Sequence, residues 1–214
     1  MKIAILGTGM VGTTLGAKLI KLGHSVMMGS RTNNNPKALE WVNNNGALAS
    51  NGTFYAAAAF CEMAFNCTSG LSSLEALQLA GRENLSGKVL VDVANPLDFS
   101  KGMPPTLSVC NTDSLGESIQ RQFPDVKVVK TLNTINCQLM VNPGLLKEPG
   151  NLFISGNDND AKTEVKKLLL DFGWKDIIDL GDITTARGTE QLLPVWVRLM
   201  GSMGTGMFNF KIVS

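Results

Sequence analysis

The sequence predicts an α/β fold with a doubly wound, mostly parallel sheet and a small C-terminal helical extension. Two features of the sequence lead to this prediction. Short apolar runs alternate with helical segments along the chain, and a glycine-rich turn follows the first run. Strands that alternate with helices in this way are joined by right-handed crossovers and form a parallel sheet. The runs are almost continuously hydrophobic, as expected for strands that are covered on both faces.

Each expected strand is a short apolar run that ends in turn residues. The runs cover residues 2–6, 24–28, a weaker 46–49, 63–67, 88–93, 127–132, 151–156 and 176–181. A helix is expected over 159–173. From Thr184 the pattern predicts a helix that is interrupted at Pro194 and followed by a glycine-rich tail. We expect a dinucleotide-binding domain over 1–150, and a strand-and-helix extension of the same globule over 151–214 that forms a dimer contact.

Composition excludes several classes of function. The chain has 214 residues, of which 44% are hydrophobic and 17% charged, and its formal net charge is +1. This balance gives no bulk attraction to nucleic acid or anionic lipid, so neither is expected as a partner. No apolar stretch approaches the ~18–20 residues that a membrane span needs. The first residues run directly into a strand, so we expect no signal peptide.

The cysteines indicate a reducing compartment. Cys61, Cys67, Cys110 and Cys137 form no Cys-x-x-Cys pair. We therefore expect free thiols in a cytoplasmic protein and no metal site.

The turn after the first strand has the spacing of a dinucleotide-binding loop. In "ILGTGMVGTTLG", Gly7, Gly9 and Gly12 stand in GxGxxG register between a strand and an amphipathic helix. This context makes the otherwise weak motif specific. Gly7 permits the tight turn, Gly9 lets the backbone approach a diphosphate, and Gly12 lets the helix pack on the strand. The sequence thus predicts a Rossmann fold with the diphosphate at the positive end of that helix.

The end of the second strand predicts which dinucleotide binds. NAD-binding proteins carry an Asp or Glu here, whereas this chain reads "GSRT", and its next acidic residue is Glu40. A carboxylate repels the 2′-phosphate of NADP, and a guanidinium binds it in a bidentate manner. Arg31 is therefore predicted to hold the 2′-phosphate, and Ser30 and Thr32 to add hydroxyl donors. The cofactor predicted is NADP(H).

The strand ends that face the substrate carry small polar residues and no evident acid or base. They read "NCTSG", "DVANPL" and "KTLNTIN". Asp92 and Lys130 fall within strands, as members of a buried pair or as edge residues. The single histidine, His24, lies in a turn at the opposite edge of the sheet, and Tyr55 belongs to no Tyr-xxx-Lys pair. We assign no catalytic residue. Hydride transfer to a flavin-like ring needs mainly stacking and alignment, and fits this composition.

Several motifs in order resemble one family over nearly the whole chain. They are "GTGMVG", "GSR", "ANPL", "KTLNTI" and the segment from "LFISGNDNDAKTEVKKLLLDFG" to "ARGTEQLLPVWVRLM". This combination resembles the NADPH-dependent deazaflavin reductases, which are similar to the cytosolic domain of membrane ferric reductases. The resemblance implies a homodimer that passes hydride directly between NADP(H) and a small-molecule acceptor, 8-hydroxy-5-deazaflavin.

The resemblance also implies roles for individual residues. The diphosphate would contact Thr8, Gly9, Met10 and Val11, and the 2′-phosphate would contact Ser30 and Arg31. The path from the adenosine to the nicotinamide would be lined by Cys67, Thr68 and Ser69. The residues near the nicotinamide would be Ala94, Asn95 and Asn133.

Two positions depart from the family pattern and leave the acceptor open. Ser69 stands where deazaflavin enzymes carry proline, and Asn133 where they can carry histidine. A flavin and a ferric chelate therefore remain alternatives to deazaflavin. A non-catalytic NADP(H)-binding redox sensor is an alternative of another class. Imine reductases share the glycine loop, but the chain beyond about residue 180 is too short for their helical dimerisation domain.

Overall fold

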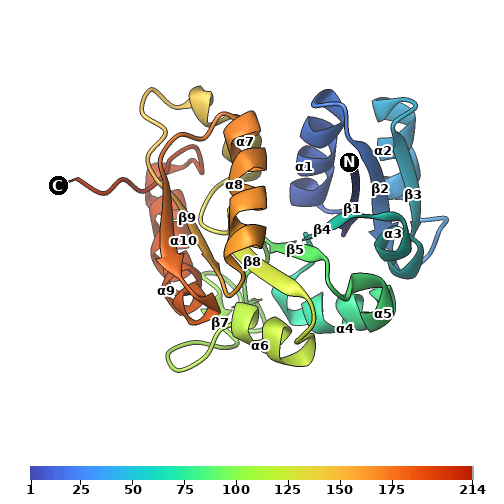
Figure 1. Cartoon of the computed structure of the whole chain (residues 1–214). Coiled ribbons are helices and arrows are strands. Elements are labelled where there is room, and N and C mark those ends of the chain that lie inside the picture. Colours follow the sequence, from blue (N-terminus) through green and yellow to red (C-terminus); the bar gives the residue numbers. More distant parts are fainter. Residues whose placement is uncertain (214) are drawn as a thin grey trace.

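The computed structural model describes residues 1–213, and one large sheet runs through it (Figure 1). The strands of this sheet are β1 (Lys2–Leu6), β2 (Ser25–Ser30), β3 (Ala49–Thr53), β4 (Met63–Asn66), β5 (Val89–Asp92), β8 (Lys127–Thr131), β9 (Leu152–Gly156) and β10 (Ile177–Gly181). A separate hairpin consists of β6 (Leu97–Asp98) and β7 (Thr106–Leu107).

Helices connect most of these strands. They are α1 (Met10–Lys21), α2 (Pro36–Asn45), α3 (Phe54–Phe60), α4 (Gly70–Ala80), α5 (Arg82–Leu85), α6 (Leu115–Gln122), α7 (Cys137–Val141), α8 (Asn159–Phe172), α9 (Ala186–Gln191) and α10 (Leu193–Met203), with 3₁₀ turns η1 (Pro143–Leu145) and η2 (Ile183–Thr185). Within residues 1–213 no helix combines the length and the apolar character that a membrane span requires.

The order of the strands is that of a doubly wound sheet. It reads β10-β9-β8-β5-β4-β1-β2-β3, and the pairs from β8 to β3 are all parallel. The chain turns outward from β1 in both directions, so β1 and β4 border a crevice at their carboxyl ends. This arrangement confirms the predicted α/β fold with a mostly parallel sheet.

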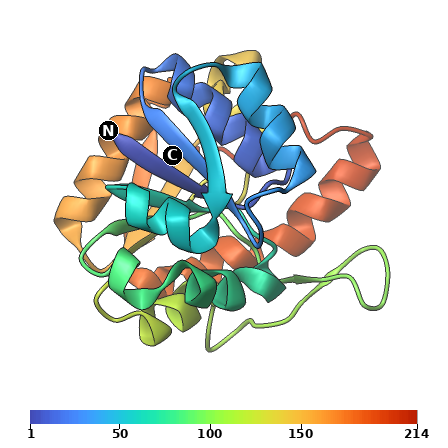
Figure 2. The same ribbon diagram turned by 90° about the vertical axis from the view of Figure 1, so that its right-hand side faces the viewer.

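Side chains of the central strand alternate between two cores. Ile3 and Ile5 belong to a cluster on one face, which packs on α1, α2, α7 and α8. Ala4 and Leu6 belong to a second cluster, which packs on α3, α4, α5 and α6. This alternation follows from the two-residue period of a strand and explains why the strands are hydrophobic throughout. The two helical layers enclose the sheet in both views (Figures 1 and 2).

Three local features differ from the sequence prediction. The weak third strand was expected at 46–49 but lies at Ala49–Thr53, because Gly46 ends α2 with a positive φ of 76°. The strand β9 runs antiparallel to β8, which the sequence did not indicate. The hairpin β6–β7 was not predicted, since its strands have two residues each. It projects from the body of the molecule (Figure 2).

The C-terminal segment extends the sheet and then covers its end. β9 and β10 pair in parallel, and α8 connects them close to the predicted bounds. Pro194 lies in the first turn of α10, where its missing N–H costs no helical hydrogen bond. The strands of residues 1–150 and 151–214 share the same sheet, and the proposed domain boundary at residue 150 stays a prediction.

Below the carboxyl ends of the strands lies a buried ion triad. The Nζ of Lys130 is 2.9 Å from Oδ2 of Asp92 and 2.8 Å from Oε1 of Glu190, and all three side chains are almost completely buried. Lys130 is thus a member of a buried pair, and not an edge residue. Burial lowers its pKa, but the two carboxylates outweigh this effect and raise the pKa above its ordinary value. The ammonium is therefore held charged.

We expect Lys130→Met to destabilise the protein by about 3–5 kcal/mol, because two buried carboxylates lose their counter-ion. Urea unfolding at neutral pH measures this loss. The exposed Lys167 of α8 provides a matched control, and Lys167→Met should change the free energy of unfolding by less than about 0.5 kcal/mol. Equal effects of the two substitutions would show that the triad is not a stabilising element.

Candidate functional site

The glycine-rich turn follows β1 and has the geometry that two of its glycines require. Gly7 has a φ of 122°, in the region that favours glycine, and a Cβ there would lie 2.7 Å from the carbonyl oxygen of Cys67. A Cβ on Gly12 would collide with the carbonyl oxygen of Gly7 and lie 3.0 Å from Cγ2 of Ile5. Both glycines are therefore required by the packing of β1, α1 and β4.

Gly9 is different, because the fold does not require it. A Cβ at this position would meet no described atom within 4 Å. Gly9 is also the N-cap of α1, and no side chain of the described residues caps this helix. The first N–H groups of a helix have no partner within the helix and carry partial positive charge. The turn thus offers both space and hydrogen-bond donors to an anion.

A second helix presents an uncapped N-terminus at the same place. Its N-cap, Ser69, makes no capping bond from its side chain within the described chain. Elsewhere side chains of Asn35, Thr53 and Asp158 cap α2, α3 and α8. The first N–H groups of α1 and α4, which begin beside the crevice between β1 and β4, thus receive no hydrogen bond from an N-cap side chain.

The cavity at these two helix ends has a volume of about 410 Å³, and we call it the glycine-loop cavity. Eight of its lining residues are predicted cofactor contacts: Gly7, Thr8, Gly9, Ser30, Arg31, Cys67, Thr68 and Ser69. The structure thus brings most of the predicted site together. Four further lining residues were missed by the sequence analysis: Asn35, Phe54, Ser72 and Ala76. Only Asn35 carries a visible signal, as the residue before the helix-starting Pro36.

Arg31 lies at the mouth of the glycine-loop cavity with its guanidinium largely free. Its side chain is 64% exposed, and its Nη2 lies 3.5 Å from Oε2 of Glu75, which is itself 60% exposed. An ion pair at this distance and exposure contributes little energy. The guanidinium is therefore available to an anionic ligand. Glu75, in α4, was not singled out from the sequence.

Some predicted contacts have other roles in the structure. The hydroxyl of Ser30 donates to the carbonyl of Thr32 at 2.5 Å and so shapes the turn after β2. Thr32 itself is exposed and does not line the cavity. Met10 is 71% exposed at the start of α1 and lines neither the glycine-loop cavity nor the cavity at the ends of β4 and β5. Gly12 is a packing residue, as described above.

A second cavity of about 280 Å³ lies at the carboxyl ends of β4 and β5, and we call it the strand-end cavity. It shares Cys67, Thr68 and Ser69 with the glycine-loop cavity, so these three residues form a common wall. Its other lining residues are mostly apolar: Val11, Gly70, Val93, Ala94, Asn95, Leu97 and Phe99. Among these described residues Cys67 carries the one titratable side chain.

Asn95 and Asn133 connect the loops that follow β5 and β8. The Nδ2 of Asn95 donates to the carbonyl of Asn133 at 2.7 Å, and the Nδ2 of Asn133 donates to Oδ1 of Asn95 at 2.9 Å. Asn133 is buried and does not line the strand-end cavity. Beneath them, Lys130 donates to the carbonyl of Ala94 at 2.5 Å. The ion triad therefore also fixes the loop that lines this cavity.

The hydroxyl of Thr68 in the common wall is engaged within the protein. The hydroxyl of Thr68 donates to Oδ1 of Asn66 at 2.7 Å, and Nδ2 of Asn66 donates to Oδ1 of Asp92 at 2.8 Å. Burial, followed by the charge of Asp92, raises the pKa of the Cys67 thiol well above its ordinary value. Cys67 is thus held as a neutral thiol. Within residues 1–213 no group of three His, Cys, Asp or Glu side chains could hold a metal ion.

The strand order and the glycine-rich turn after β1 are those of a Rossmann-type dinucleotide-binding fold. Residues 2–96 match the family described as NADP oxidoreductase, coenzyme F420-dependent. The chain belongs to this family of NADP-dependent oxidoreductases. The F420-dependent NADP reductase of Methanocaldococcus jannaschii is 27% identical over 224 residues, and the match covers 97% of each chain.

A second curated relative is much longer than this chain. Metalloreductase STEAP3 of Rattus norvegicus is 30% identical over 209 residues. The match covers 91% of this chain but only 38% of that protein.

Two solved structures illustrate the range of structural similarity. A protein from Arthrobacter sp. FB24, named provisionally as an F420-dependent NADP reductase, has 55% identity and a TM-score of 0.95, with 100% of both chains covered. An imine reductase from Bacillus cereus has 16% identity and a TM-score of 0.62, and the match covers 95% of this chain and 62% of that one. At that identity the imine reductase shows a shared fold alone.

Thiol reactivity at pH 8 should separate two of the cysteines. We expect Cys110, which is exposed, to be alkylated at least ten times faster than Cys67, because a thiol with a raised pKa contains little reactive thiolate. Mass spectrometry of peptides after timed iodoacetamide treatment measures both rates in one sample. Equally fast labelling of Cys67 would contradict the assigned environment of its thiol.

Proposed function

We propose that the protein transfers hydride directly between NADP(H) and a deazaflavin or flavin-like acceptor. The observation that carries this proposal is the common wall formed by Cys67, Thr68 and Ser69. A dinucleotide that enters the glycine-loop cavity passes along this wall into the strand-end cavity. Its nicotinamide then lies at the carboxyl ends of β4 and β5, where ligands of doubly wound sheets bind.

The glycine-loop cavity suits the diphosphate and the adenosine end. The uncapped N-termini of α1 and α4 donate N–H groups to the diphosphate, and Gly9 leaves room for it. Arg31 takes the 2′-phosphate, since its guanidinium lies at the end of β2 and has only a weak partner in Glu75. The hydroxyl of Ser30 holds the turn that carries Arg31.

The strand-end cavity suits two stacked rings. When bound, NADPH supplies a hydride, which carries two electrons to the acceptor ring. The residues around that position align the rings and exclude water: Val11 and Val93 give apolar contact, and the paired amides of Asn95 and Asn133 keep the loops in place. A neutral Cys67 thiol adds no charge to this environment. Alignment is the contribution required for hydride transfer between rings.

The relatives bear on the acceptor. The name of the M. jannaschii protein indicates a deazaflavin, coenzyme F420, and that of STEAP3 indicates a metal. Deazaflavin is favoured because the match with the M. jannaschii protein covers nearly all of both chains. The proposal further includes that the protein is a homodimer and acts in the cytoplasm. The homodimer is supported by the apolar surface of α10 and the tail, where Val195, Met203 and Met207 are exposed.

We expect the purified protein to oxidise NADPH faster than NADH when 8-hydroxy-5-deazaflavin is the acceptor. The decrease in absorbance at about 340 nm follows the reaction, with FMN, FAD and a ferric chelate offered separately. Faster turnover with the ferric chelate would instead favour a metal as the acceptor, as the name of STEAP3 indicates. Tight NADPH binding without turnover on any of these acceptors would favour a redox sensor.

Arg31→Ala should weaken NADP⁺ binding by about 1.5–3 kcal/mol and leave NAD⁺ binding almost unchanged, because only NADP⁺ carries the 2′-phosphate. Isothermal titration with both dinucleotides measures the difference. Arg121→Ala, which removes an exposed arginine paired with Asp113, is the matched control. Equal losses for both dinucleotides in Arg31→Ala would refute the 2′-phosphate assignment.

Gly9→Val should fold normally and lose the binding of both dinucleotides.

A further inference from the structure

The ion triad of Lys130, Asp92 and Glu190 contains one more negative charge than positive charges. One ammonium faces two carboxylates, and none of the three side chains is more than 2% exposed. The described hydrogen-bond partners of the Asp92 side chain are all donors: Nδ2 of Asn66, the N–H of Ala94 and Nζ of Lys130. Both oxygens of Asp92 therefore act as acceptors, as those of an ionised carboxylate do.

Glu190 is surrounded by donors in the same way. Its carboxylate accepts from Nζ of Lys130 and from the N–H groups of Leu115 and Gly116 at the start of α6. These N–H groups carry partial positive charge and offset only part of the charge of Glu190. Within residues 1–213 no second lysine or arginine pairs with either carboxylate of the triad. The excess negative charge therefore stays in the core.

The triad reaches the strand-end cavity through the backbone of one residue. Ala94 lines this cavity. Its N–H donates to Oδ1 of Asp92 at 3.2 Å, and its carbonyl accepts from Nζ of Lys130. A single residue thus separates the buried charges from the surface at which we place the nicotinamide.

A second connection runs through Asn66 to the wall shared by the two cavities. The Nδ2 of Asn66 donates to Oδ1 of Asp92, and its Oδ1 accepts from the N–H and the hydroxyl of Thr68. The charge of Asp92 also contributes, after burial, to the raised pKa of the Cys67 thiol. The sign of this contribution indicates a negative field at the shared wall.

The two redox forms of a nicotinamide ring differ in charge. The reduced ring is neutral. When its C4–H bond breaks and both electrons leave with the hydride, a cationic ring remains, and the acceptor ring gains the hydride and a proton from solvent. A negative charge nearby stabilises the cation and has little effect on the neutral ring, and this preference is strong where water is excluded.

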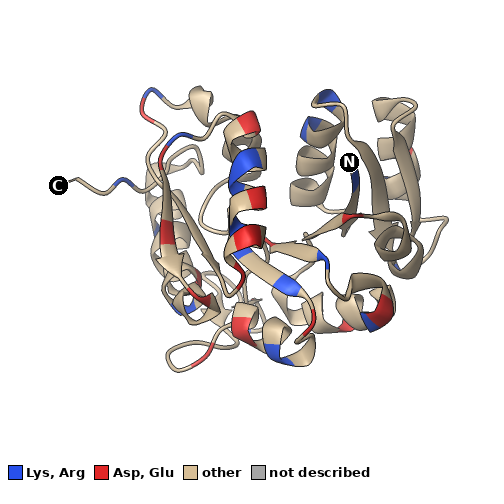
Figure 3. Cartoon of the chain, in the orientation of Figure 1, with Lys and Arg blue, Asp and Glu red and all other residues tan. Residues whose placement is uncertain are grey.

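No broad surface field opposes this effect of the triad. The formal net charge of the chain is +1, and basic and acidic residues are mixed over the visible elements (Figure 3). Exposed charges are also screened by water and salt, whereas buried charges are screened much less. The triad is therefore the charged group that acts most strongly on a ring in the strand-end cavity.

We propose that the ion triad stabilises the oxidised, cationic nicotinamide relative to the reduced ring and so favours hydride donation by bound NADPH. Asp92 and Glu190 act through their field and touch neither ring. This inference rests on the proposed function, because it places the nicotinamide in the strand-end cavity. It also accounts for the second carboxylate, which a single ammonium does not need for charge balance.

The test measures the ratio of two dissociation constants, the Kd of NADP⁺ divided by the Kd of NADPH, by titration calorimetry without an acceptor. Asp92→Asn should raise this ratio roughly tenfold, because it removes the charge next to Ala94 and keeps the shape of the side chain. Glu190→Gln should raise it roughly threefold, because α6 already offsets part of that charge. If one variant does not fold, the other decides. A purely structural role weakens the binding of both forms together and leaves the ratio unchanged.

The matched control is Asp179→Asn in β10. Asp179 pairs with Lys162 at 3.0 Å and with Lys166 at 3.1 Å on the edge strand of the sheet, and it lines neither cavity. Its substitution should leave the ratio of the two dissociation constants unchanged. An unchanged ratio in the folded triad variants, or an equal rise in the control, overturns the proposal.

The proposed function can fail independently of the triad. The ratio is measured without an acceptor, so a protein that turns over no acceptor still yields it. If the ratio does not change, the alkylation rate of Cys67 in Asp92→Asn identifies the cause. A faster rate shows that the field reaches the shared wall and that the nicotinamide lies elsewhere, against the proposed function. An unchanged rate shows that the field does not reach the wall, and the proposed function then stands without this inference.

Discussion

The buried ammonium of Lys130 is the interaction on which the arrangement of the site depends. It joins Asp92 at the end of β5 to Glu190 of α9 and holds the carbonyl of Ala94 in the loop above. Glu190 in turn accepts hydrogen bonds from the first N–H groups of α6. One side chain thus connects the central sheet, the loop that lines the strand-end cavity and the C-terminal segment. A buried charge is costly to isolate, so these elements keep a single relative position.

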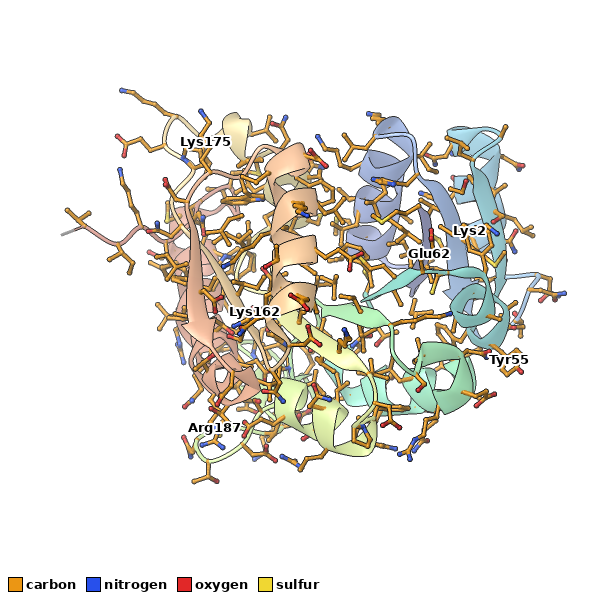
Figure 4. All side chains as sticks on the ribbon, viewed as in Figure 1. Lys2, Tyr55, Glu62, Lys162, Lys175 and Arg187 are labelled. Carbon is orange, nitrogen blue, oxygen red and sulfur yellow. The ribbon has the colours of Figure 1, made fainter. Side chains whose placement is uncertain are left out.

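The C-terminal part is anchored a second time, at the surface. Arg187 of α9, labelled in Figure 4, lies at the surface. It donates to both carboxylate oxygens of Glu117 in α6, and the guanidinium keeps the pKa of that carboxyl below its ordinary value. Glu117 is also bonded to Ser114, the N-cap of α6. The short helix α9 therefore rests on α6 through one buried and one partly exposed contact. This docking compensates for its length, since six residues are too few for a stable helix alone.

The sequence predicted what depends on local pattern and short motifs. Strand positions, the GxGxxG turn and Arg31 follow from hydrophobic period and residue spacing, and the structure places most of the predicted contacts around two cavities. Phe54, Glu75 and Glu190 were missed because their roles arise only when distant segments meet. The antiparallel β9 was missed because strand direction depends on tertiary pairing. The weak third strand was displaced because its small residues have little strand propensity of their own.

The wall shared by the two cavities has a kinetic consequence. Cys67, Thr68 and Ser69 belong to both cavities, so the two cavities adjoin. For the hydride transfer proposed here, the reaction runs through a ternary complex, and no covalent carrier on the protein is needed between two half-reactions. Steady-state plots against either substrate then intersect and are not parallel. The proposed ternary complex thus depends on three consecutive residues after β4.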